Sequence, residues 1–246
     1  MLTFDDQPGS KWAYLCQPNR EKQTGKLAIF IHGFNGKYLA TWGRIPELLR
    51  VHAETDPDCK SWDFLFLGYD TVNVETYLDI AAILSTELGK ARKGNAPFQA
   101  EYHTFALFGH SLGTLGIRQL LCATAAHPNG GLGTLHNIVL FGTPLNGSGL
   151  ASWVRFVKIS RALEAGNPQL RMLRTWSKGV HAHAPWPLVQ VVLGLDDKIV
   201  GSRLAELVEW PGDVTPPERT NLDHSALVKP ESWNSPVINY LQNALK

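Results

Sequence analysis

The chain has 246 residues, of which 44% are apolar, so it is long enough to bury one sizeable hydrophobic core. Its formal net charge of +1 gives no general basis for nucleic-acid binding. Its three cysteines are widely separated and form no C-x-x-C pair, which argues against a zinc framework and a disulfide scaffold.

These features indicate a soluble protein of a reducing compartment, and we expect it to be cytoplasmic. The N-terminus lacks a basic segment followed by an apolar core, so it does not resemble a signal peptide. No apolar stretch approaches the roughly 20 residues that a membrane-spanning helix needs.

The first hundred residues alternate apolar runs with amphipathic stretches. A candidate strand covers residues 11–16, and the continuous apolar run at 27–31 is typical of a strand that is covered on both faces of a parallel sheet. A helix is expected over residues 38–51 and a strand over 62–67. Residues 74–93 then have the periodicity of a long amphipathic helix.

The same alternation continues through the rest of the chain. Apolar runs at 105–108, 137–141 and 188–193 indicate three more buried strands, and a helix follows the first of them. Ser235-Pro236 is a favourable start for a final helix. Alternating strands and helices predict an α/β fold with a doubly wound, mostly parallel sheet in a single domain over residues 1–246.

Residues 147–187 interrupt this alternation, because they have helical patterns but no strand. The segment follows a strand end, where active-site loops lie in such folds. Its basic residues are interleaved with aromatic ones, and Glu164 is its one acid between residues 150 and 180. We expect a helical cap in which Trp153 and Phe156 contact substrate, and which makes transient contact with a membrane surface. The alternative is a layer that only packs on the domain and exposes its charges to water.

The central motif is Gly109-His110-Ser111-Leu112-Gly113, which lies between an expected strand and an expected helix. This arrangement is called a nucleophile elbow, and it exposes the serine hydroxyl on a sharp turn. The two glycines are required because the tight turn leaves no room for side chains there. A bare G-x-S-x-G arises by chance in roughly one chain in ten of this size, so its structural context carries the argument.

A serine nucleophile needs a histidine base that a carboxylate holds in place. Asp196 and Asp197 both follow the strand at 188–193, and His224 lies in a polar loop before the final helix. The order serine, aspartate, histidine is the one expected of an α/β-hydrolase. The spacing alone does not choose between the two aspartates.

The tetrahedral intermediate needs two N–H donors for its oxyanion, and Leu112 and Phe34 are the expected sources. Asn35 and His110 lie beside these groups and are expected to contact substrate, although the His110 ring should point away from the serine hydroxyl. His181 and His183 form a weak metal pair without further ligands nearby. We therefore expect neither a metal nor another cofactor.

These motifs resemble the lipase-like serine esterases of the α/β-hydrolase superfamily, and most closely the branch of GPI-inositol-deacylase-like and related serine-esterase domains. The resemblance rests on residues 29–36 with Thr41-Trp42, the elbow, residues 141–144 with 147–148, and residues 223–225 with 228–230. In this superfamily the acid usually lies in a G-x-x-D-x-x-V stretch, which here is Gly194–Val200 and selects Asp197. Thr114 and Leu145 depart from the branch pattern, which weakens any transfer of its substrate.

The sequence thus predicts a serine hydrolase that cleaves a small-molecule or lipid ester through Ser111, His224 and Asp197, with an acyl-enzyme intermediate. A thioesterase or an acyltransferase with the same triad, or a non-catalytic binding module of the same fold, are the alternatives. The sequence does not specify an oligomeric state.

Overall fold

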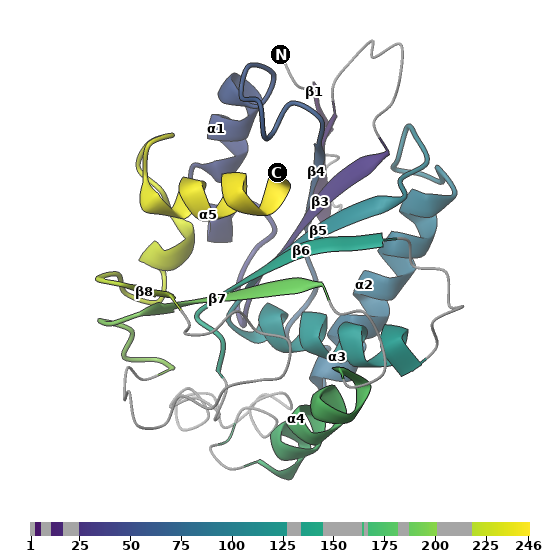
Figure 1. Ribbon diagram of the computed structural model, residues 1–246, viewed down its shortest axis with the longest axis vertical. Helices are drawn as coiled ribbons and strands as arrows, with labels where there is room; N and C mark the ends of the chain where they lie inside the picture. The colour runs from purple at the N-terminus through teal and green to yellow at the C-terminus, as the bar shows by residue number, and fades with distance from the viewer. Residues whose placement is uncertain are drawn as a thin grey trace.

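One mixed sheet organises the protein (Figure 1). The computed structural model describes residues 3–5, 11–16, 25–126, 134–144, 164, 167–181, 187–200 and 218–246. The strand order is β1-β2-β4-β3-β5-β6-β7-β8. The strands are β1 (Thr3–Asp5), β2 (Trp12–Cys16), β3 (Lys26–Ile31), β4 (Asp63–Leu67), β5 (Thr104–His110), β6 (Thr134–Phe141), β7 (Leu188–Gly194) and β8 (Glu218–Thr220). β2 is antiparallel to both β1 and β4, and the pairs from β4 to β8 are parallel, which confirms the predicted mostly parallel sheet.

Helices cover both faces of this sheet, as a doubly wound fold requires (Figure 1). One face packs against α1 (Ile45–His52) and α5 (Pro236–Leu245). The other packs against α2 (Tyr77–Arg92), α3 (Leu112–Ala126) and α4 (Pro168–His181). None of the helices in the described part of the chain is long and apolar enough to cross a membrane.

The central strands are held in register by their alternating side chains. In β3, Ile29 joins the core under α2 and α3, whereas its neighbour Phe30 joins the core under α1 and α5. The Phe30 ring stacks on Phe66 of β4 and Phe108 of β5, with ring centroids 4.6 and 4.7 Å apart. Such aromatic pairs each contribute about 0.5–1.5 kcal/mol beyond their buried area. This ladder aligns the carboxyl ends of the three strands, from which the candidate site is built.

The prediction of one continuous helix over residues 38–51 was wrong, because the structure divides this segment into two helices. A short 3-10 helix, η1 (Ala40–Trp42), is followed by Gly43 at a φ of 54°, and α1 begins only at Ile45. A side chain at position 43 would lie 3.0 Å from Cγ of Lys229. Pro46 is accommodated because it falls in the first turn of α1, where its missing N–H breaks no helical hydrogen bond.

The short edge strands β1 and β8 were not predicted. Each has only three residues, too few to show a strand periodicity. β8 nevertheless matters for the site, because it pairs with β7 and carries the chain back beside the end of that strand. The η5 helix (Ala226–Val228) follows, so residues 221–225 form the connection in which His224 lies.

The segment expected to form a cap is described only in part. Its helix α4 packs on α3 and buries Leu170, Leu173 and Ser177. Residues 145–163 lie outside the described part of the chain, and Trp153 and Phe156 lie among them. The cap and the single-domain partition stay predictions.

Candidate active site

Ser111 lies on a strained turn between β5 and α3. Its φ of 53° is in the left-handed region, which costs a non-glycine residue roughly 1–2 kcal/mol. The turn is held on both sides: Ser111 N–H donates to the Phe141 carbonyl at 2.9 Å, and Thr114 donates its N–H and its hydroxyl to the Ser111 carbonyl at 3.0 and 2.5 Å. Strain held in place by neighbouring hydrogen bonds is typical of functional sites.

The glycines around Ser111 are needed for close packing, as the sequence predicted. A Cβ on Gly113 would lie 2.5 Å from the carbonyl oxygen of His32, and one on Gly109 would lie 3.1 Å from Cα of Thr114. Gly33, in the loop after β3, is equally constrained, because its Cβ would lie 2.6 Å from Cβ of Ser111. The elbow and the loop after β3 are therefore in direct backbone contact.

His224 and Asp197 are brought together by the loops after β8 and β7. Nδ1 of His224 lies 2.7 Å from Oδ2 of Asp197. The other carboxylate oxygen, Oδ1, accepts the N–H groups of Ile199 and Val200 at 2.9 and 3.0 Å. Asp197 is 3% exposed, whereas Asp196 is exposed to solvent, so the structure distinguishes the two aspartates.

The environment of Asp197 favours its charged form. Burial alone would raise its pKa, but the hydrogen bond and charge of His224 and the two backbone N–H groups outweigh burial and lower the pKa. An ionised carboxylate accepts the Nδ1–H of His224, which leaves Nε2 of that imidazole as the acceptor.

The imidazole of His224 is in contact with residues next to Ser111. The ring of His110 lies 4.7 Å from it, centroid to centroid, and Gly142 approaches so closely that a Cβ there would lie 3.0 Å from Nδ1 of His224. His110 precedes Ser111, and Gly142 follows the residue that accepts the Ser111 N–H. The structure thus brings Ser111, His224 and Asp197 to one end of the sheet.

The loop after β3 is held by His32, a residue that the sequence analysis did not assign. Its Nδ1–H donates to the Gly33 carbonyl at 2.7 Å, and its Nε2 accepts the Tyr69 N–H at 3.2 Å. The two rings stack 4.4 Å apart, and the Tyr69 hydroxyl donates to the His32 carbonyl at 2.8 Å. Burial lowers the pKa of His32, in keeping with a neutral ring. One signal was present in the sequence: His32 lies one residue after the end of β3, and Tyr69 lies two residues after the end of the neighbouring strand β4.

The remaining predicted residues have different environments. Leu112 is the first residue of α3, where N–H groups lack acceptors within the helix. Phe34 is half-buried, and Asn35 is exposed at a φ of 52° with its N–H donating to the Thr71 hydroxyl at 3.3 Å. His110 is only 8% exposed. Across the described residues, no group of three or more His, Cys, Asp and Glu side chains is placed to hold a metal ion.

The sheet order and the elbow define an α/β-hydrolase fold, and solved structures agree. The chain is similar to the mature form of the Bacillus licheniformis lipase BlEst2, with a TM-score of 0.66 and 15% identity over 96% of this chain and 99% of that one. It is similar to esterase B from Lactobacillus rhamnosis, with a TM-score of 0.60 and 16% identity over 100% of this chain and 85% of that one. A carboxylesterase structure from the thaumarchaeon Nitrososphaera gargenis matches with a TM-score of 0.54 and 15% identity over 98% of both chains.

No protein-family model matches the chain, and neither does any curated protein sequence. At identities of 15–16%, the structural matches establish the fold alone.

Proposed function

We propose that the protein is a serine hydrolase that cleaves carboxylic esters through Ser111, His224 and Asp197. The observation that carries the proposal is the 2.7 Å contact between His224 and Asp197, buried beside a serine on a strained elbow. An Asp–His pair next to such a serine is the arrangement that activates a hydroxyl for attack on a carbonyl. The fold's similarity to a lipase and an esterase supports the same reaction class.

In the proposed reaction, Nε2 of His224 takes the proton from the Ser111 hydroxyl as its oxygen bonds to the ester carbonyl carbon. Asp197 stabilises the resulting imidazolium, and the N–H groups of Phe34 and Leu112 donate to the oxyanion. The C–O bond then breaks, and the alcohol leaves with the proton from His224. Water attacks the acyl-enzyme by the same route, which releases the acid and restores the hydroxyl.

The test combines a covalent probe with a model ester. We expect the protein to hydrolyse p-nitrophenyl butyrate and to be labelled by a fluorophosphonate. Ser111→Ala should abolish the labelling and lower kcat by at least about 10⁴-fold, because the nucleophile is removed. Ser85→Ala, on helix α2 and outside the proposed site, serves as the control. A folded wild-type protein that neither reacts with the probe nor hydrolyses the ester would instead be a non-catalytic module of this fold.

The leaving group is tested by pairing oxygen esters with thioesters of the same acyl chain. The proposed esterase should prefer the oxygen esters in kcat/KM. A preference for the thioesters would make the protein a thioesterase, and transfer of the acyl group to an added alcohol would make it an acyltransferase. The narrower resemblance to GPI-inositol-deacylase-like domains remains a prediction.

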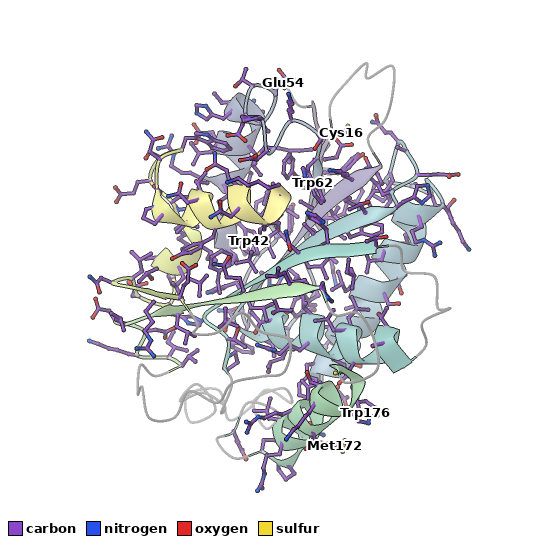
Figure 2. All side chains as sticks on the ribbon, viewed as in Figure 1. Cys16, Trp42, Glu54, Trp62, Met172 and Trp176 are labelled. Atoms are coloured by element: carbon purple, nitrogen blue, oxygen red, sulfur yellow. The ribbon has the colours of Figure 1, made fainter. Side chains whose placement is uncertain are left out.

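We also propose that the ester is a lipid at an anionic surface, which α4 contacts. Met172 and Trp176 lie one turn apart on α4 and are 61% and 53% exposed, and Figure 2 shows them at the edge of the molecule. The helix contains no acid and exposes three basic residues, namely Arg171, Arg174 and Lys178. Exposed apolar side chains beside basic ones are typical of helices that bind anionic lipid surfaces.

Vesicle sedimentation tests this contact. The protein should bind vesicles of phosphatidylcholine with 30% phosphatidylglycerol more strongly than phosphatidylcholine alone. The double variant Met172→Ser/Trp176→Ser should weaken binding, whereas Leu78→Ser on α2, which removes an equally exposed apolar side chain, should not. Equal binding by all variants would mean that α4 only packs on the domain.

The compartment is likewise a proposal. Cys16, Cys59 and Cys122 are buried and form no disulfide, which supports a reducing compartment such as the cytoplasm.

A further inference from the structure

His110 makes a long-range hydrogen bond to the loop that carries the proposed base. It is the last residue of β5 and directly precedes Ser111. Its Nε2 lies 2.9 Å from the carbonyl oxygen of His224, 114 positions further along the chain. Because a carbonyl oxygen can only accept, His110 must carry its proton on Nε2 and donate it to His224.

The remaining hydrogen bonds of this loop are mostly local. Asp223 accepts the N–H groups of Ser225 and Ala226 at 2.8 Å each, which shapes the turn but does not attach it to the sheet. His110, by contrast, belongs to β5, which pairs with β3 and β6. Its bond therefore connects the backbone of residue 224 to the strand that directly precedes Ser111.

The two imidazoles are also in contact. Their centroids are 4.7 Å apart and their planes are inclined by 46°. Gly142, at a φ of 57°, supplies a second contact to the His224 ring, and its N–H donates to the Val192 carbonyl of β7 at 2.9 Å. The ring of His224 is thus confined by residues that the sheet itself holds in place.

We infer that His110 is a positioning residue, whose Nε2–H holds the His224 carbonyl and thereby keeps the imidazole aligned between Asp197 and Ser111. The inference rests on the proposed function, since it assumes that His224 is the base. It differs from the role in substrate contact that the sequence suggested for His110. A displacement of about 1 Å in a catalytic group can cost about a hundredfold in rate, so one such bond has a measurable effect.

The environment of His110 suits a donor that must stay neutral. Burial and the charge of His224 lower the pKa of His110 to about 3. The ring can therefore remain against His224 while that residue takes the serine proton, without the repulsion that a charged donor would cause. Lysine or arginine at position 110 could donate the same bond, but only as a cation.

Three substitutions separate this role from simple packing. Gln can place an amide N–H where Nε2 of His110 lies, Asn carries the same amide on a side chain one methylene shorter, and Leu fills space without a donor. His110→Leu and His110→Asn should lower kcat for p-nitrophenyl butyrate by about 10–100-fold with KM within twofold. His110→Gln should stay within about fivefold of wild type. Wild-type kcat in His110→Leu, or equal losses in the Gln and Asn variants, would overturn the inference.

A spectroscopic signal tests the inference without activity. The Nδ1 proton of His224, shared with Asp197, should give a strongly deshielded NMR resonance in wild type and in His110→Gln. The resonance should broaden or disappear in His110→Asn, and its persistence there would contradict the inference. If His224→Ala keeps full esterase activity, the proposed function fails instead, and the resonance still reports whether His110 aligns the ring.

Discussion

Nδ1 of His224 and Oδ2 of Asp197 lie 2.7 Å apart, although the residues are 27 positions apart in the chain. The contact depends on the hydrogen bonds that the loop after β7 makes to the Asp197 carboxylate. Oδ1 accepts two backbone N–H groups of this loop. The side chain cannot rotate without breaking these two hydrogen bonds, and Oδ2 is therefore directed to the imidazole. One carboxylate oxygen thus anchors the loop, and the other orients the histidine.

This division predicts that the two neighbouring aspartates respond differently to the same substitution. Asp197→Asn should lower kcat by about 10³–10⁴-fold, because a neutral amide neither fixes the tautomer of His224 nor stabilises its cation. Asp196→Asn, at an exposed position, should stay within twofold of wild type. Steady-state kinetics with p-nitrophenyl butyrate measures both, and the opposite ranking would assign the acid to Asp196.

The elements around the site were predictable because their patterns are local. The apolar run before Ser111, the two flanking glycines and the helix from Leu112 to Ala126 all follow from short-range rules. The choice of Asp197 over Asp196 was not local. It needed the resemblance to a family, because spacing does not tell which of two neighbouring loop residues turns inward.

The features that the sequence did not predict depend on contacts between residues far apart in the chain. At the break between η1 and α1, Gly43 packs closely against Lys229, and the ring of His32 stacks on Tyr69. The bond from His110 to His224 joins residues that no periodicity connects. Such contacts exist only once the sheet has brought the strand ends together, so a reading of the sequence finds their residues but not their partners.

The left-handed conformation of Ser111 predicts that removing its side chain stabilises the protein. Ser111→Gly should relieve strain of roughly 1–2 kcal/mol, offset by the larger unfolded-state entropy of glycine, for a net gain of about 0.5–1 kcal/mol. Ser111→Ala keeps the Cβ and is the matched control. Urea unfolding compares the two inactive variants, and equal free energies of unfolding would mean that the turn is unstrained.

The contact between α3 and the loop after β3 predicts a large effect of a single methyl group. In Gly113→Ala the new Cβ would meet the His32 and Ile31 carbonyl oxygens at 2.5 and 2.6 Å, and these backbone atoms cannot move cheaply. We expect a loss of about 1–3 kcal/mol in the free energy of unfolding, with reduced activity.

Gly89→Ala is the matched control, since the same methyl group on α2 meets no atom within 4 Å. Its expected effect is a stabilisation of about 0.4–1 kcal/mol, because alanine restricts the unfolded chain. A thermal scan of both variants measures these shifts. Similar unfolding temperatures for the two would show that the loop yields to the added methyl group.

The buried neutral histidines predict how stability depends on pH. Burial lowers the pKa of His32, and burial with the charge of His224 lowers that of His110 to about 3, so the unfolded chain, with a histidine pKa near 6.5, binds these protons first as the pH falls. The stabilising contribution is complete above about pH 6.5 and is lost as the pH falls toward 3. For His110 the slope of the free energy of unfolding against pH is up to about 1.4 kcal/mol per pH unit.

His110→Gln should reduce this slope by up to that amount between pH 6 and 4. Above pH 7 the curves of free energy of unfolding against pH should be parallel for the variant and the wild type, and urea titrations at each pH measure them. Equal slopes in the two proteins below pH 6 would mean that His110 binds its proton as readily in the folded protein as in the unfolded chain.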